Sequence, residues 1–372
     1  MNRLDKITPF LVMDVLKKAQ SIADVIHFEV GEPDVPPSPR VIEAMAKAIG
    51  DGKFRYTEAL GLLALREKIA AFYYERYQVD VSPARIVLTV GTSGAFLVTY
   101  AILLNAADKL LLTDPGYPCY KNFSYLLDTE PVFVPIDKST GYQLTVEQLK
   151  AYQDIKAVQI SSPSNPIGNV YSQATLKALV DYCENHQIYF ISDEIYHGLV
   201  YGQTAHTALE FSDNAIVING LSKYFGLPGL RLGWVILPPK LVRAAEVLMQ
   251  NLYICAPTLS QYGALEAFDA EHLDWVTNTF QKRRDYLYNE LSQLFTIDVK
   301  PEGAFYIWAD ISQYSVDSLK FSQRLLDEVH VATTSGIDFG NHQTNQYLRF
   351  AYTREIAHLC EGVERLKNFL GH

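Results

Sequence analysis

Lys223 is the residue whose type and setting point most directly to chemistry. It follows the apolar run Ala215–Asn219 and lies in the segment Gly220–Arg231, whose small residues leave room for a bulky ligand. Arg231, eight positions further on, carries a permanently charged guanidinium fork that suits a phosphate. A desolvated lysine near another cation has a lowered pKa and can form a Schiff base with an aldehyde. A lysine at a strand end is usually a plain surface residue, but this setting favours covalent chemistry.

Polar or small residues follow four other apolar runs of the chain in the same way. In an open α/β sheet, ligands bind outside the carboxyl ends of the strands, so we expect these residues along one edge. Their convergence is more informative than any one motif. The four segments are Gly91–Gly94 (GTSG), Asp114–Tyr117 (DPGY), Ser162–Pro166 (SPSNP) and Asp193–Tyr196 (DEIY).

Asp193, Tyr117 and Arg349 are candidate ligand contacts. Asp193 ends an apolar run and could keep a pyridinium nitrogen protonated, although a lone Asp is more often a helix cap. Tyr117 could stack on a flat ring, although an isolated aromatic residue more often packs in a core. Arg349 interrupts the apolar run Tyr347–Tyr352 and could clamp a carboxylate, although half-exposed strand arginines are common.

Thr92 and Ser93 lie where a strand is expected to turn into a helix. Backbone N–H groups at a helix start, together with two hydroxyl groups, form a good phosphate cradle. Many such turns are rich in glycine and serine, so the segment alone is a weak signal. It matches neither the Walker A pattern nor the dinucleotide-binding G-x-G-x-x-G pattern.

Seven short apolar runs alternate with amphipathic helices through the middle of the chain. Most of the runs are nearly continuous in Val, Ile, Leu or Phe, as strands covered on both faces should be. Thr145 and Gln148 have capping-box spacing, and Ser172 precedes another helix. This alternation predicts an α/β fold, with a mostly parallel seven-stranded sheet covered by helices. The runs are Ile86–Val90, Lys109–Thr113, Val132–Ile136, Ala157–Ser161, Tyr189–Ser192, Ala215–Asn219 and Leu232–Leu237.

The last part of the chain has a different pattern, which predicts a smaller α+β domain. A helical stretch from about Ser260 to Leu294 leads into Gly303–Ile311, a helix near Leu319–Val329, a strand near Tyr347–Tyr352 and a final helix. We expect an N-terminal segment (1–35) that contributes to the small domain, a large ligand-binding domain (36–280) and a small C-terminal domain (281–372).

Composition limits the classes of function. The chain has 372 residues, 48% of them hydrophobic, and a net charge of −10, which argues against disorder and nucleic-acid binding. Its four cysteines are far apart and form no CxxC pair, which favours reduced thiols over disulfides or a metal site. The charge-free stretch Ile86–Ala107 is interrupted by Gly91–Gly94, so it predicts a buried strand, turn and helix rather than a membrane span. We expect a soluble, cytoplasmic protein that binds no membrane.

Taken in order, these segments resemble the class I/II (aspartate aminotransferase-like) family of fold-type I enzymes that depend on pyridoxal 5′-phosphate (PLP). The resemblance also includes Val30–Asp34 (VGEPD), Tyr56–Gly61 (YTEALG) and Gly336–Gly340 (GIDFG), and it runs essentially from end to end. Two positions depart from the family pattern. Ile167 stands where the family commonly has Thr in Asn-Pro-Thr-Gly, and Ser335 stands where it usually has Pro. The second motif shapes the substrate side, so specificity is affected more than chemistry.

The resemblance implies a role for each matching residue. Lys223 would carry the internal aldimine and move a proton between the substrate Cα and the cofactor's C4′. Asp193 would pair with the pyridine nitrogen, Tyr196 and Asn165 would hydrogen-bond the ring O3′, and Tyr117 would stack on the ring. The phosphate would be held by Thr92, Ser93, Ser222, Arg231 and the Tyr56 of a neighbouring subunit, which implies a homodimer with shared active sites. The substrate carboxylate would be bound by Gly31, Asn165 and Arg349.

The expected function is therefore ping-pong transfer of an amino group from an L-amino acid to a 2-oxo acid, with 2-oxoglutarate or pyruvate as the family's usual acceptors. A carbon–sulfur β-lyase on the same site is an alternative, and it would release ammonia and pyruvate from cysteine conjugates. A non-catalytic PLP-binding regulator is disfavoured, because such proteins append a DNA-binding segment, whereas here the family motifs begin near residue 30 and the chain is acidic. The sequence does not name the amino donor.

Overall fold

The computed structural model describes residues 3–372 and contains one seven-stranded sheet in the order β2-β8-β7-β6-β5-β3-β4. Strand β8 is antiparallel to both of its neighbours, and the other neighbouring pairs are parallel. All seven predicted runs are confirmed as strands of this sheet within a residue or two. The strands are β2 (Ile86–Val90), β3 (Lys109–Asp114), β4 (Glu130–Pro135), β5 (Ile155–Ser161), β6 (Tyr189–Asp193), β7 (Ile216–Gly220) and β8 (Leu232–Ile236).

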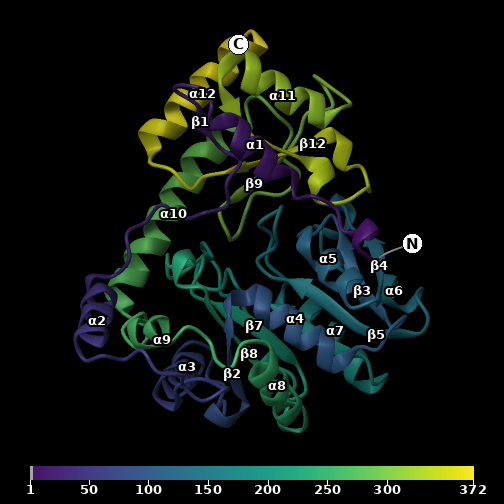
Figure 1. Ribbon diagram of the computed structural model, residues 1–372. Coiled ribbons are helices and arrows are strands. Elements are labelled where there is room, and N and C mark those ends of the chain that lie inside the picture. The colour runs from purple at the N-terminus through teal and green to yellow at the C-terminus, as the bar shows by residue number, and fades with distance from the viewer. Residues whose placement is uncertain (1–2) are drawn as a thin grey trace.

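Helices cover both faces of the sheet, as Figure 1 shows. The strand side chains divide between two apolar clusters: one includes α4 and α8, and the other includes α3 and α7. This double covering explains why the strands read as continuous apolar runs. The predicted capping box of Thr145 and Gln148 begins α6. The helices of this part of the chain are α2 (Pro39–Gly50), α3 (Leu63–Tyr77), α4 (Gly91–Leu103), α5 (Cys119–Leu126), α6 (Val146–Lys150), α7 (Gln173–Asn185), α8 (Pro239–Leu252) and α9 (Thr258–Ala264).

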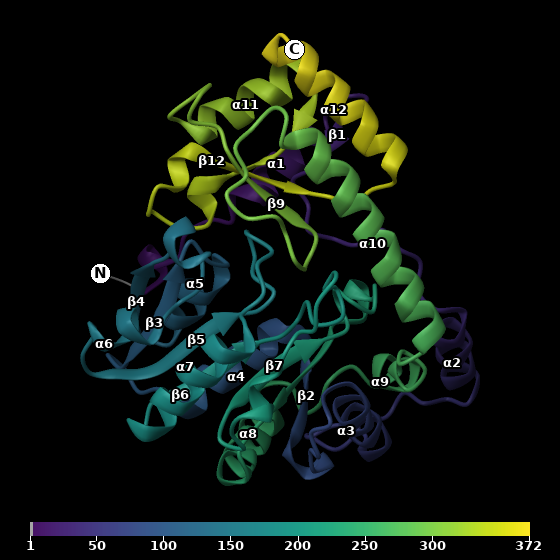
Figure 2. The same ribbon diagram turned by 180° about the vertical axis from the view of Figure 1, so that it is seen from behind.

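The C-terminal elements form a second layer above the sheet's edge (Figures 1 and 2). A three-stranded antiparallel sheet has the order β11-β12-β9, and β1 pairs in parallel with β10. Helix α1 lies among these elements, so residues near both ends of the chain meet here. The elements are α1 (Leu11–Ala19), β1 (Ile26–His27), α10 (Ala270–Leu291), β9 (Tyr306–Asp310), α11 (Ser318–Val329), β10 (Val331–Ala332), β11 (Thr334–Ser335), β12 (Tyr347–Ala351) and α12 (Ile356–Leu370).

The helical stretch expected from about Ser260 to Leu294 is interrupted, because residues 265–269 separate α9 from α10. The chain leaves the helix after α9 and starts again at α10, with Asp269 at the N-cap position. The Asp269 carboxylate accepts a hydrogen bond from Ser38 Oγ at 3.0 Å, which fixes this corner against the start of α2. The domain division expected near residue 280 falls inside α10. It stays a prediction.

The strand and the helix expected in the charge-free stretch are confirmed as β2 and α4, but Gly91–Gly94, expected as a turn between them, form the first turn of α4. None of the helices between residues 3 and 372 combines the length and the apolar character needed to cross a bilayer.

Candidate active site

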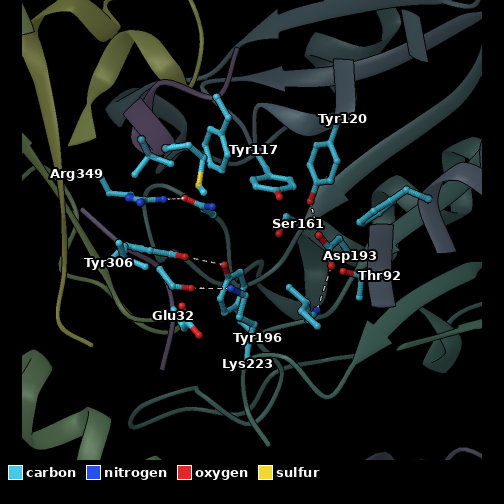
Figure 3. A pocket seen from close by; sticks show the side chains of 18 of the residues that line it. Glu32, Thr92, Tyr117, Tyr120, Ser161, Asp193, Tyr196, Lys223, Tyr306 and Arg349 are labelled. Atoms are coloured by element: carbon cyan, nitrogen blue, oxygen red, sulfur yellow. Dashed lines mark hydrogen bonds between the residues drawn. The ribbon is translucent and has the colours of Figure 1, made fainter. Parts of the chain in front are cut away.

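A cavity of about 230 Å³ lies at the carboxyl ends of β5, β6 and β7. Figure 3 shows Arg349 and Tyr306 on one side of it and Tyr120, Asp193 and Thr92 on the other. The structure brings eight of the predicted site residues together in its lining: Gly31, Thr92, Tyr117, Asn165, Asp193, Tyr196, Lys223 and Arg349.

Lys223 supplies the amine of this cavity. Its Nζ donates a hydrogen bond to the backbone oxygen of Gly31 at 2.6 Å. Burial lowers the pKa of Lys223 to about 8, and the positive charges of Arg349 and Arg231 act in the same direction. An ammonium with this pKa loses its proton far more readily than an exposed lysine, so a nucleophilic amine is available near neutral pH.

Asp193 is the buried carboxylate opposite the lysine. Its Oδ1 accepts the Ile195 N–H at 3.1 Å, and its Oδ2 accepts the Tyr120 hydroxyl. Burial raises the pKa of Asp193 to about 6, while the hydrogen bonds from Tyr120 and Ile195 and the charge of Lys223 oppose that shift. The carboxylate is therefore ionised at neutral pH and can pair with a protonated ring nitrogen.

Two glycines let the N-terminus of α4 lie close against the sheet. A Cβ on Gly233 would stand 2.8 Å from the backbone of Gly91 and Thr92, and one on Gly220 would stand 3.2 Å from Thr92 Cγ2. The Arg231 guanidinium lies over the same turn, 2.6 Å from where a Cβ on Gly91 would be. Free backbone N–H groups at the positive end of a helix, next to a guanidinium, form a site for a phosphate.

Arg349 is a buried cation with fixed geometry. Its two terminal nitrogens donate to Asn165 Oδ1 at 3.0 Å and to the Glu29 backbone oxygen at 2.6 Å. The guanidinium also lies between two rings, 4.3 Å from the Tyr306 centroid and 4.8 Å from that of Phe339. Side-chain freedom is lost before any ligand arrives, so a carboxylate would meet a preorganised cation.

Four predicted site residues do not line the cavity. Ser222 is buried beside Lys223, whereas Ser93 is exposed on the first turn of α4. Arg231 is exposed to solvent, although its guanidinium lies against that turn. Tyr56 lies away from the cavity with 75% of its surface exposed. Their predicted contacts with a ligand stay predictions.

A family model described as aminotransferase class I and II matches residues 23–366 of the chain. The chain belongs to this family. It is 37% identical to the (5-formylfuran-3-yl)methyl phosphate transaminase of Methanocaldococcus jannaschii, across 99% of this chain and 98% of that protein. It is 34% identical to a valine–pyruvate aminotransferase of Mycobacterium tuberculosis, across 98% and 97% respectively. A crystal structure of an aminotransferase from Mycobacterium tuberculosis matches with a TM-score of 0.95 at 34% identity, covering 98% of this chain and 97% of that chain.

This aminotransferase is an enzyme whose cofactor is PLP. The donor set of the cavity fits that group. An amine with a lowered pKa suits the aldehyde, a buried carboxylate suits the ring nitrogen, and the start of α4 beside Arg231 suits the phosphate.

Sequence reasoning missed several residues of the site. Tyr120 contacts Asp193 from the first turn of α5, and it stands three positions after Tyr117, which precedes that helix; this closeness in sequence could have revealed it. The Tyr306 hydroxyl lies 2.9 Å from that of Tyr196, and only the fold brings the two together. The residues of α1 that line the cavity also escaped notice, although Val12, Val15, Leu16 and Ala19 have the spacing of one apolar helix face.

Proposed function

We propose that this aminotransferase moves an amino group from an L-amino acid to a 2-oxo acid in two half-reactions at one site. One observation carries the proposal: a readily deprotonated amine, a buried carboxylate and a fixed guanidinium line the same cavity. The M. jannaschii relative is named for a furan methyl phosphate and the M. tuberculosis relative for valine and pyruvate. Similarity to these relatives therefore does not identify the amino donor.

PLP supplies an aldehyde carbon that exchanges amines and a ring that accepts electrons from the substrate's α-carbon. Lys223 would hold that carbon through Nζ and, after an incoming amine displaces it, would move a proton between the substrate Cα and the cofactor. Its lowered pKa supports this use, because the amine must be unprotonated to accept a proton. Asp193 would keep the ring nitrogen protonated.

The remaining residues would bind and orient. Thr92, Ser93, Ser222 and Arg231 would hold the phosphate at the start of α4. Tyr117 would cover one face of the ring, and Tyr196, fixed by the Tyr306 hydroxyl, would bind its O3′ together with Asn165. Arg349 and Gly31 would orient the substrate carboxylate with Asn165, whose Oδ1 already contacts Arg349. A homodimer would complete each site with the Tyr56 of the other subunit.

The test is a single half-reaction measured spectroscopically with each common amino acid. We expect the aldehyde form to convert to the amine form with release of one 2-oxo acid and no ammonia. The Lys223→Ala variant should slow this conversion by about 10²–10⁴-fold, the usual contribution of a positioned acid–base group. Release of ammonia and pyruvate from a cysteine conjugate, without the amine form, would favour a β-lyase instead.

A further inference from the structure

Helix α1 forms an apolar wall on the substrate side of the cavity. Val12, Met13 and Leu16 line it, and Phe10 precedes them with its ring edge-on to Tyr117 at 6.1 Å between centroids. Val12 is buried, whereas Met13 lines the cavity with 55% of its surface exposed. A large apolar side chain left half exposed at a cavity mouth is suited to covering an apolar ligand group.

The wall is held in place by the segment that also covers Arg349. The Asp338 carboxylate accepts the Leu11 N–H at 3.1 Å and the Val12 N–H at 3.2 Å, which satisfies free donors at the start of α1. The next residue, Phe339, lies against the Arg349 guanidinium. The cation that would bind a carboxylate and the apolar wall are therefore fixed to the same short segment.

The residues that this chain itself contributes to the lining leave no cation for a second carboxylate. Among the described residues, the cations that line the cavity are Lys223 and Arg349, and the anions are Glu32 and Asp193. Lys223 would be occupied by the cofactor, and Arg349 by the substrate's α-carboxylate. The nearby cations Lys6 and Lys121 line a different hollow, which lies beyond Tyr117.

From this arrangement we infer that the donors of this aminotransferase are amino acids with uncharged, apolar side chains, and that α1 is the wall that selects them. The inference rests on the proposed function, because it describes the same site. A donor bound at Arg349 and Lys223 directs its side chain toward the remaining lining, where Val12, Met13 and Leu16 would take it out of water. A side-chain carboxylate would lose hydration there, without a cation and near the Glu32 carboxylate.

The same argument applies to the acceptor, because donor and acceptor use one site in turn. A 2-oxo acid with an apolar or short side chain fits the wall, whereas the second carboxylate of 2-oxoglutarate meets the same unpaired environment. Of the two acceptors usual in the family, the charges of the cavity therefore favour pyruvate.

The experiment compares half-reactions of the PLP-loaded enzyme with leucine, methionine, phenylalanine, lysine, aspartate and glutamate. We expect the apolar donors to exceed both acidic donors in kcat/KM by at least about tenfold, because the side-chain carboxylate of an acidic donor would have no partner in the cavity. Aspartate or glutamate as the best donor would overturn the inference and leave the proposed function standing. A positively charged donor as the best substrate would overturn it as well.

Two variants test whether α1 makes the selection. Met13→Arg adds a cation to the exposed part of the wall, and it should raise the kcat/KM of glutamate relative to that of leucine by about tenfold. Gln20→Arg adds the same charge at an exposed position next to α1 that does not line the cavity, so this control should leave the ratio unchanged. Equal ratios in the two variants would show that α1 does not determine which donor is preferred.

A binding measurement separates the two proposals. The probes are 4-methylpentanoate and glutarate, which carry one and two carboxylates and no amine. Tighter binding of 4-methylpentanoate, followed by the cofactor's absorbance, is expected, and tighter binding of glutarate would contradict the apolar wall. This readout requires no amino transfer, so absence of any half-reaction would sink the proposed function while the probes still decide the preference of the cavity.

Discussion

At the scale of single residues, the ionisation of Asp193 depends on its burial, on the nearby Ile195 N–H and on Tyr120, which is distant in the sequence. Burial favours the neutral acid, whereas the Tyr120 hydroxyl and the Ile195 N–H favour the carboxylate. The outcome is a pKa of about 6, close enough to neutrality for one hydrogen bond to affect the active form. Sequence reasoning identified Asp193 from its place at a strand end, but it could not supply the pKa, which requires the burial and the partners.

We predict that Tyr120→Phe shifts the acid side of the pH–activity profile to higher pH. The hydrogen bond from Tyr120 lowers the pKa of Asp193, so its loss raises that pKa further above the ordinary carboxyl value. The ionised carboxylate is present above the pKa and is lost as the pH falls through it, so activity should begin to fail at a higher pH. The measurement is the pH dependence of kcat/KM between about pH 5 and 8, the range around the pKa of about 6 of Asp193.

Tyr125→Phe is the matched control for this prediction. It makes the same substitution on the same helix, α5, at a residue that lines the neighbouring hollow and contacts Lys6 there. Its acid limb should coincide with that of the unaltered enzyme. An unshifted profile in Tyr120→Phe would show that the hydroxyl does not control the ionisation of Asp193.

At the scale of elements, the strands could be predicted and part of their arrangement could not. Burial on both faces makes each strand a continuous apolar run, and this signal is local. The antiparallel direction of β8 comes from how the chain returns to the sheet, and the end of α9 comes from tertiary contacts such as that between Asp269 and Ser38. Helix α1 was not predicted as part of the site, because its amphipathic pattern contains no motif typical of catalysis or ligand binding.

The close approach of α4 to β8 gives an element-scale prediction. Gly233→Ala places a Cβ 2.8 Å from backbone atoms of Gly91 and Thr92, so the N-terminus of α4 must move. We expect this overpacking to lower the free energy of unfolding by about 1–3 kcal/mol. The Kd for PLP should also rise, because the moved turn is where the phosphate would be held. Urea unfolding and cofactor titration measure the two effects.

Gly229→Ala serves as the control, since a Cβ at that exposed position meets nothing within 4 Å. Gly229 lies close before Gly233 in the sequence, on the other side of Arg231, so the variant tests for a general effect of alanine in this part of the chain. Unchanged stability and cofactor affinity in Gly233→Ala would contradict this prediction. They would show that the N-terminus of α4 can move without loss of free energy of unfolding.

At the scale of the whole molecule, the cavity is built from segments near both ends of the chain and from the sheet between them. Residues of α1 and Gly31 come from the N-terminal region, Asp193 from the end of β6, Lys223 from the turn after β7, and Arg349 from β12. The backbone oxygen of Glu29 accepts from Arg349, and that of Val30 accepts from Thr353 Oγ1 at 3.0 Å, so the N-terminal segment is joined to the C-terminal elements beside the site. Composition and local pattern carry no record of these long-range contacts, which only the ordered family motifs made predictable.

Tyr56 extends the question beyond one subunit, because it lies outside the cavity with 75% of its surface exposed. If the proposed homodimer shares its sites, Tyr56 acts in the site of the other subunit. Mixing Tyr56→Ala subunits with Lys223→Ala subunits should then restore activity, since each mixed dimer has one site with an intact lysine and an intact tyrosine. Random exchange would make up to about a quarter of all sites intact. The assay is run at a PLP concentration that saturates the unaltered enzyme but not Tyr56→Ala. Each variant alone serves as the control, and a mixture no more active than the sum of its parts, after verified subunit exchange, would place Tyr56 outside the partner's site.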